Sequence, residues 1–356
     1  MKVSRIAKLA LASSIVLSAA CVLAGSPAGG YQLTKTVTYS AAPGAGATRE
    51  YFDYVIPEPS ARRMYFTEGT AVHVVNADTG EKIGSVTGAD WKRVHGVALV
   101  PELNKGFITD GDAATVIVFD LKTLKPTKTI KAEDDADWIL YDTASKMIFV
   151  FNGDAHTATA IDPVKEEVVK SIPLGGAPEQ AYADGKGMIY DTLQSTNEIV
   201  AIDTKELVVK SRFPVAPAGA PTSITMDRKT RRLFVGGRNP KVLIMMDADT
   251  GKVIGEPLPI GDRVDANIFD PATNMLAAAT REGTLHIFHE DSPNKLSVVE
   301  TIKTQFGAKT MGLDPKTHKL FLTTSDFGPA PAPTEKQPNP QPVATPGTFR
   351  LLIYAK

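Results

Sequence analysis

Seven residues with polar side chains follow one another through the chain at almost constant spacing. They are Asp53, His95, Asp137, Glu179, Thr222, Asp265 and Lys309, separated by 42, 42, 42, 43, 43 and 44 positions. Six of the seven are ionisable, although the repeat around them is largely apolar. We call these seven positions the ring register. Such spacing indicates one position in a repeated unit, so we expect the side chains to converge and bind a ligand.

The carboxylates of the ring register would repel one another in a narrow opening. At about 8 Å each pair costs only ~0.5 kcal/mol in water, and several times more in a partly dry channel. The opening must therefore hold water, bind a cation or raise the carboxylate pKa values. Oxygen ligands from Asp137, Glu179 and Asp265 suit a divalent cation such as Ca²⁺ or Mg²⁺. His95 suits a transition metal or a general base, and Lys309 suits the anionic part of a substrate.

The unit that would position the ring register is a set of four short strands. In 225–255 the sequence TMDRKTRRLFVGGRNPKVLIMMDADTGKVIG reads as strand, polar turn, strand, loop, strand and Asp-Thr-Gly turn. The first apolar residue of the second strand recurs at Met64, Gly106, Met147, Met188, Leu233, Leu276 and Leu320. Alternating, β-branched runs at this spacing are typical of propeller blades, and they lack the 3.6-residue period of a helical solenoid.

We therefore predict an all-β chain that forms a seven-bladed β-propeller of four-stranded antiparallel blades. Segment 31–39 alternates like a fourth strand, and 348–356 supplies a third strand to the last blade. We expect the N-terminal strand to complete that blade and close the ring, because an open ring exposes strand edges. The propeller then spans 31–356 as a single domain. Its blades surround an axial channel, and the ring register gathers at one mouth of it.

Several segments carry a resemblance to a known family. They are VVNADTGEKIGSV, KSIPLGGAPEQAYADGKGMIYD, RRLFVGGRNPKVLIMMDADTGKVIG and LDPKTHKLFLTTS. Over 31–356 the chain resembles the YVTN-type seven-bladed β-propeller repeat family of exported bacterial and archaeal proteins. The YVTN tetrad itself is blurred in every copy. The resemblance implies the propeller fold but no single activity, because such propellers include binding proteins, surface-layer components, lyases, lactonases and quinoprotein subunits.

Other loops carry polar or aromatic residues near the predicted mouth. The loops between second and third strands contribute Asp110, Asp112, Asn152, Asp154, His156, Arg238, Arg281 and Glu282, a composition typical of turns. Trp91 and Trp138 precede inner strands, and we expect them to wedge between blades or to wall a binding pocket. The Pro-rich insert at 327–347 interrupts the last blade, and we expect a flexible tether or a ligand for a protein partner.

The first 24 residues are typical of an export signal. Lys2, Arg5 and Lys8 precede a largely apolar run, and cleavage after Ala24 would leave 25–30 as a short spacer. We therefore expect a periplasmic or extracellular protein; an uncleaved membrane anchor is an alternative. The single cysteine, Cys21, lies inside this signal. Lipidation of Cys21 is the other alternative, although Ser18 stands where that signal favours leucine.

Composition and missing motifs exclude several classes of function. After cleavage the chain has no cysteine for disulfides, iron–sulfur ligation or thiol catalysis. The balance of 39 basic and 40 acidic residues gives no clear nucleic-acid signal. Gly-rich phosphate loops, H-E-x-x-H and G-x-S-x-G are also missing. We expect a monomer without a transmembrane domain in the mature chain.

Two functions remain open from the sequence. The first is a binding or scaffold protein that holds a small molecule, a metal ion or a peptide at the channel mouth. The alternative is a metal-assisted lyase or lactonase, with a cation on Asp137, Glu179 and Asp265 and with His95 as base. Propellers serve both kinds of function, so the fold does not decide whether the protein is an enzyme.

Overall fold

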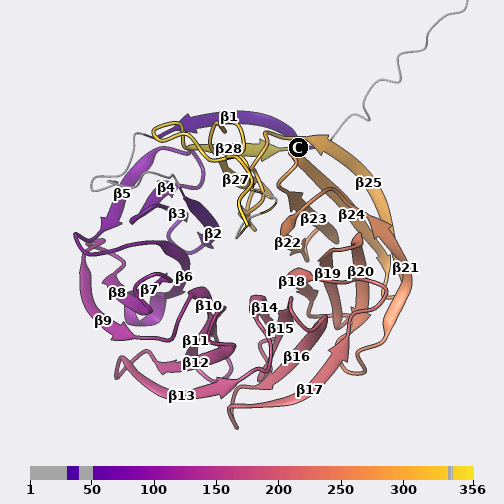
Figure 1. Cartoon of the computed structure of the whole chain (residues 1–356), viewed down its shortest axis with the longest axis horizontal. Coiled ribbons are helices and arrows are strands. Elements are labelled where there is room, and N and C mark those ends of the chain that lie inside the picture. Colours follow the sequence, from indigo (N-terminus) through magenta and orange to yellow (C-terminus); the bar gives the residue numbers. More distant parts are fainter. Residues whose placement is uncertain (1–29, 40–50, 336–337, 339) are drawn as a thin grey trace, which may run out of the picture. The chain divides into compact units, whose positions relative to one another are not determined.

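The computed structural model describes residues 30–39, 51–335, 338 and 340–356. Segment 31–356 forms a ring of seven four-stranded antiparallel sheets, shown in Figure 1. This arrangement confirms the predicted seven-bladed β-propeller. Within the described ranges the helical content is one 3-10 turn, η1 (Pro101–Leu103), and no helix is long and apolar enough to cross a membrane. The predicted signal at 1–24 lies outside the described residues, as does the spacer up to residue 29.

Blades one to six each consist of four consecutive strands, counted here from the axis outward. Blade one is β2 (Phe52–Glu58), β3 (Arg63–Glu68), β4 (Ala71–Asn76) and β5 (Lys82–Thr87), and blade two is β6 (Val94–Val100), β7 (Lys105–Asp110), β8 (Thr115–Asp120) and β9 (Pro126–Lys131). Blade three is β10 (Ala136–Asp142), β11 (Met147–Asn152), β12 (Thr157–Asp162) and β13 (Glu167–Pro173).

The next three blades repeat this order around the ring. Blade four is β14 (Pro178–Ala183), β15 (Met188–Leu193), β16 (Glu198–Asp203) and β17 (Val208–Pro214). Blade five is β18 (Pro221–Asp227), β19 (Arg232–Arg238), β20 (Lys241–Asp247) and β21 (Val253–Pro259), and blade six is β22 (Val264–Asp270), β23 (Met275–Thr280), β24 (Thr284–Ser292) and β25 (Lys295–Lys303).

Blade seven closes the ring with strands from both ends of the propeller. Its order is β26 (Met311–Leu313), β27 (Leu320–Thr324), β28 (Arg350–Ala355) and β1 (Gln32–Thr38). Strand β1 pairs antiparallel with β28, from Gln32 opposite Ala355 to Thr38 opposite Arg350. The predicted closure by the N-terminal strand is therefore confirmed.

Among the described residues the core consists of seven apolar clusters, each of them between two neighbouring blades. Between blades seven and one, for example, Phe349 packs against Phe52 and Phe66, with ring centroids 5.4 and 5.9 Å apart. The second and third strands of a blade are buried on both faces, so they read as continuous apolar runs. The outermost strands, such as β13, are largely exposed.

Turn residues fix the register of each blade. Asp120 at the end of β8 accepts hydrogen bonds from the backbone N–H groups of Lys122 and Thr123, at 2.9 and 2.7 Å. The same side-chain-to-backbone turn follows Asn76, Asp162, Asp203 and Asp247. The strand pairing corrects two of the repeat positions predicted from the sequence. In blades three and four the residues equivalent to Met64 are Ile148 and Ile189, each one position after the predicted methionine. This follows from the pairing of the first two strands, in which Ala136 lies opposite Asn152 and Pro178 opposite Leu193.

The two ends of the Pro-rich insert pair with each other, and Phe327 and Ala344 pack in the core cluster between blades seven and one. Phe327 forms a β-bridge with Ala344, and Gly328 N–H donates to the Val343 carbonyl at 2.9 Å. The Phe327 ring packs edge-on against Phe306, with centroids 4.9 Å apart, and belongs to the cluster between blades seven and one. The ends of the insert are thus structural parts of blade seven.

Candidate functional site

The structure places the ring register at one position of the blade. Six of its residues are the second residue of an innermost strand, and Lys309 lies two residues before β26. In each of these six strands the pairing shifts at or beside this residue, a β-bulge that redirects the side chain. Threonine hydroxyls hold the bulged backbone in place. Thr109 donates to the Asp137 carbonyl at 2.6 Å, and Thr310 to the Asp53 carbonyl at 2.7 Å.

Most of the ring register converges on one cavity of about 230 Å³, which we call the mouth cavity. Four acidic side chains (Asp53, Asp137, Glu179 and Asp265), four basic ones (Arg238, Arg263, Arg281 and Lys309) and the phenols of Tyr51 and Tyr54 line it. His95 and Thr222 are not among the lining residues. His95 lies against Asp53 and Asp137, and the Thr222 hydroxyl accepts from the Gln194 side-chain amide at 3.2 Å.

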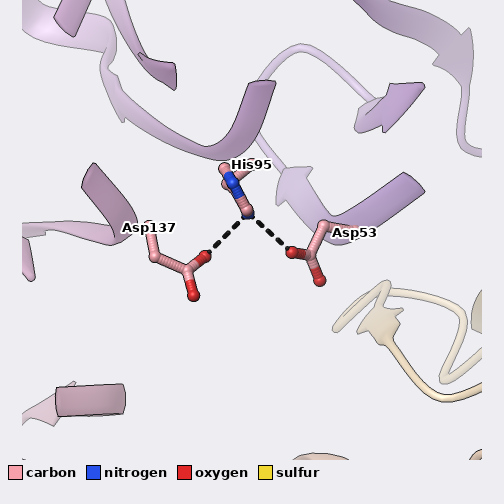
Figure 2. A group of neighbouring side chains, drawn as sticks. All are labelled: Asp53, His95 and Asp137. Atoms are coloured by element: carbon pink, nitrogen blue, oxygen red, sulfur yellow. Dashed lines mark hydrogen bonds and ion pairs between the residues drawn. The ribbon is translucent and has the colours of Figure 1, made fainter. Parts of the chain in front are cut away.

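His95 bridges two carboxylates from the neighbouring blades. Its Nδ1 lies 3.0 Å from Asp53 Oδ2 and 3.0 Å from Asp137 Oδ1, as Figure 2 shows. Burial by itself would lower the pKa of His95, but the carboxylates of Asp137 and Asp53 raise it to about 10. Burial would likewise raise the pKa of Asp53, but Lys309, His95 and Tyr51 lower it to about 2. The group is therefore an imidazolium between two carboxylates at neutral pH.

Tyr51 completes this group and was not singled out from the sequence. Its hydroxyl donates to Asp53 Oδ2 at 2.5 Å and lies 2.6 Å from His95 Nδ1, while the Arg93 guanidinium stacks over its ring. Tyr51 directly precedes β2, two residues before Asp53. No spacing signal marks it, because its role depends on the phenol reaching across to the next blade.

Replacing Tyr51 with phenylalanine tests this arrangement. We expect Tyr51→Phe to lower the free energy of unfolding by roughly 1–2 kcal/mol, because the hydroxyl bonds to charged partners in a partly buried place. Urea unfolding followed by circular dichroism measures the change. Tyr141→Phe is the matched control: its hydroxyl contacts the exposed Glu102, and we expect a smaller loss. Equal losses in both variants would contradict the special role of the His95 group.

The other side of the mouth cavity is basic. Lys309 Nζ and the Arg238 guanidinium both pair with Asp265, and Lys309 Nζ also lies 3.6 Å from Asp53 Oδ1. Burial would lower the pKa of Lys309, but Asp265 and Asp53 raise it above its usual range, so the ammonium stays charged. From the sequence, Arg238 and Arg281 were expected in turns; in the structure Arg238 is the last residue of β19 and Arg281 directly follows β23. Arg263, which directly precedes β22, was missed.

Glu179 has a different environment from the other carboxylates. Its Oε1 accepts from the Gln194 side-chain amide at 2.8 Å. Burial is the largest cause that raises its pKa, and Asp265 and Asp137 raise it further; Arg238 and Lys309 lower it, and the pKa is raised to about 8. Glu179 is therefore mainly a neutral carboxylic acid at pH 7, and its O–H is a hydrogen-bond donor.

The predicted metal ligands have different partners from those expected. Among the described residues, the group with ligand atoms within 4.8 Å of one another is Asp53, His95 and Asp137, which shares only Asp137 with the predicted set of Asp137, Glu179 and Asp265. Asp265 faces two side-chain cations, and Glu179 is mainly protonated. A divalent cation would have to displace these positive charges and protons. Arg238 and Lys309 are thus the counter-ions of Asp265, which the sequence had indicated as a metal ligand.

His95 is also poorly suited to the role of general base. A base must accept a proton near neutral pH, whereas the pKa of His95 is raised to about 10. Its Nδ1 faces two carboxylates and a phenol, and its Nε2 is buried without a partner among the described residues. The arrangement favours a fixed positive charge that orients Asp53 and Asp137.

A second cavity, of about 310 Å³, lies further along the inner strands and is mainly apolar. Trp138, Tyr182, Phe269 and Met311 are among its lining residues. Trp138 also packs edge-on against Tyr54 of the mouth cavity, with ring centroids 4.5 Å apart. Trp91, in contrast, packs in the cluster between blades one and two, as expected for a wedge.

The polar residues in the loops between the second and third strands of the blades have mainly structural contacts. Asp110 accepts from the backbone N–H groups of Lys92 and Arg93, at 2.8 and 3.0 Å. The Arg93 side chain pairs with Asp112 and Asp135 at 2.8 and 3.0 Å. These bonds hold the loop before β6, and through it the position of His95.

Comparison with known proteins establishes the fold. No family model and no curated protein matches the chain. A chain of the Kuenenia stuttgartiensis hydrazine synthase is similar in structure, with a TM-score of 0.67 and 15% identity over 89% of this chain and 99% of that one. U3-55K is similar with a TM-score of 0.69 and 8% identity over 86% and 98% of the two chains. At such low identity these similarities show the propeller fold alone.

Proposed function

We propose that this protein is an exported binding protein that holds a small polar molecule in the mouth cavity. The observation that carries the proposal is the convergence of charged side chains from blades one, three, four, five, six and seven on one cavity. Its volume of about 230 Å³ lies below the roughly 300–1,000 Å³ of drug-sized sites, which favours a small molecule over a peptide. Export remains an inference from the sequence of residues 1–24.

Charged groups held in fixed positions are suited to binding. The carboxylates of Asp53 and Asp265 and the ammonium of Lys309 are held by one another and by their neighbours, so little side-chain freedom is lost when a ligand enters. The enzyme alternative has weaker support, since its base would be a protonated His95 and its cation would face Arg238 and Lys309.

Ligand binding that depends on Lys309 tests the proposal. The full mature protein is screened by thermal shift against sugars, amino acids, organic acids, phosphates, amines and divalent cations, and hits are measured by calorimetry. We expect at least one small polar compound to bind, and Lys309→Met to weaken its binding tenfold or more. Lys165→Met, which changes an exposed lysine that pairs with Asp162 in blade three, is the control and should not alter the affinity.

Two results would contradict the proposal. One is a ligand that binds Lys309→Met as tightly as it binds the unchanged protein, which would place its site elsewhere. The other is that no compound of any class raises the melting temperature. Circular dichroism spectra of Lys309→Met show whether the variant is folded, so that a loss of ligand binding can be distinguished from unfolding.

A further inference from the structure

The second cavity, of about 310 Å³, belongs to the axial channel, and we call it the apolar cavity. Six innermost strands contribute to its lining: β2, β10, β14, β18, β22 and β26. The ring register lies at the start of these strands. Two other lining residues lie at the opposite end, where Pro271 directly follows β22 and Pro315 lies two residues after β26. The apolar cavity therefore extends to the turns on the face of the ring that is opposite the mouth.

The lining of the apolar cavity is uncharged. None of the described residues that line it has a charged side chain, and its walls include the large side chains of Trp138, Tyr182, Phe269 and Met311. Arg228, which is not a lining residue, stacks over the Tyr182 ring and donates to the Ala183 carbonyl at 2.6 Å. The cavity thus offers a ligand apolar contacts and aromatic faces rather than ion pairs.

The amide and hydroxyl side chains of the lining already bond to the protein. Gln180 and Thr225 each accept a hydrogen bond from a backbone N–H group of the next blade, at 3.0 and 3.3 Å. The Asn267 amide bonds to Ser223 of blade five. These side chains connect neighbouring inner strands and fix the shape of the cavity. A ligand therefore enters a preformed space.

Trp138 contributes a buried hydrogen-bond donor to this wall. Its indole Nε1 is shielded from solvent and has no hydrogen-bond partner within the described ranges. A buried N–H group without an acceptor costs free energy, which an acceptor on a bound molecule would recover. Trp138 lines the apolar cavity and packs against Tyr54, which lines the mouth cavity, so this pair lies where the two cavities meet.

We propose that the apolar cavity binds a small uncharged compound of about two fused rings, with a hydrogen-bond acceptor that bonds to the Trp138 indole N–H. This site is separate from the mouth cavity, so the inference goes beyond the proposed function. A charged group would lose its hydration there without gaining a partner. An apolar ring gains the dispersion contacts that an unfilled space lacks. Since an apolar cavity of roughly 150 Å³ holds benzene, about 310 Å³ suits two fused rings.

Calorimetry at pH 7 on the full mature protein tests the proposal with quinoline, naphthalene and naphthoate. Quinoline and naphthalene have the same shape, but only quinoline has an acceptor nitrogen, and naphthoate adds a negative charge. We expect quinoline to bind about threefold to tenfold more tightly than naphthalene, as one neutral hydrogen bond would give. Naphthoate should bind at least tenfold more weakly than naphthalene. In Trp138→Phe the quinoline and naphthalene affinities should become equal, because phenylalanine keeps a ring but lacks the N–H donor.

Fluorescence and a filled cavity locate the site. Trp91 and Trp138 are the two tryptophans of the chain, so Trp91→Phe leaves one fluorophore, in the wall of the apolar cavity. We expect quinoline to quench it with the dissociation constant that calorimetry gives. Ile268→Trp, which fills the cavity, should weaken quinoline binding at least tenfold. Ile83→Trp, the same change at an exposed position of the outer strand β5, should alter it less than twofold. Circular dichroism shows whether each variant is folded.

The outcomes separate this inference from the proposed function. If folded Trp138→Phe still prefers quinoline over naphthalene, or if naphthoate binds as tightly as quinoline, the inference is wrong. If Lys309→Met weakens quinoline binding and Ile268→Trp does not, quinoline binds in the mouth cavity, and the inference is again wrong. If neither quinoline nor naphthalene binds, the apolar cavity is not a binding site. The proposed function would remain in that case, since it depends on polar compounds whose binding requires Lys309.

Discussion

Deleting Gln32–Thr38 should abolish the cooperative unfolding transition or lower the free energy of unfolding by on the order of 5–10 kcal/mol. Strand β1 supplies the outer strand of blade seven and pairs with β28 along its whole length. Its flanking residues are also buried: the Tyr31 hydroxyl donates to the His318 carbonyl at 2.9 Å, and Tyr39 packs against Phe349. Without β1, strand β28 becomes an exposed edge, and the ring is closed by a blade of only three strands.

The matched control is a chain that begins at Gly30, which keeps β1 and removes only what precedes the propeller. We expect its melting temperature to equal that of the longer chain. A synthetic peptide of residues 30–39 added to the deletion variant should restore part of the lost stability, because the β28 edge and the packing sites for Tyr31 and Tyr39 remain. An unchanged melting temperature in the deletion variant would contradict the closure seen in the structure.

The fold could be predicted from the sequence because a propeller repeats its signals. Strand β1, placed by its alternation and by the missing fourth strand of the last blade, lies where it was expected. The error at Met147 and Met188 has a physical cause: the half-buried methionine that begins each strand is as apolar as the buried isoleucine that follows it. Periodicity alone does not distinguish the two, whereas strand pairing does.

The candidate site could be predicted only in part. The repeat fixes where Asp53, Glu179 and Lys309 stand, and the structure brings all three to one cavity. It does not fix what long side chains from other loops do, so the pairing of Arg238 with Asp265 was not foreseen. The prediction of a divalent cation rested on carboxylates counted without these counter-ions. Side-chain reach across blades has no signature in the spacing of the sequence.

The protein should be most stable near pH 4–5 and lose stability as the pH rises. His95, whose pKa rises from 6.5 to about 10, stabilises the folded state fully below pH 6.5 and loses this contribution between pH 6.5 and 10. Glu179, whose pKa rises from 4.5 to about 8, lowers stability between pH 4.5 and 8, since the folded state disfavours its charged form. Asp53, with its pKa lowered from 3.8 to about 2, loses its contribution only as the pH falls from 3.8 to 2.

Thermal unfolding between pH 4 and 9 measures this profile. We expect the free energy of unfolding to fall by on the order of 3–6 kcal/mol from pH 5 to pH 9, which corresponds to roughly 5–10 °C in melting temperature. Glu179→Gln should flatten the profile between pH 5 and 8, because glutamine keeps the shape of the acid without its titration. Glu290→Gln is the matched control: burial and Asp227 raise the pKa of Glu290 to about 7 despite its bond to Thr230, but it lies in β24, away from the mouth. If Glu179→Gln leaves the slope unchanged while Glu290→Gln removes it, the mouth cavity does not hold Glu179 in its neutral form.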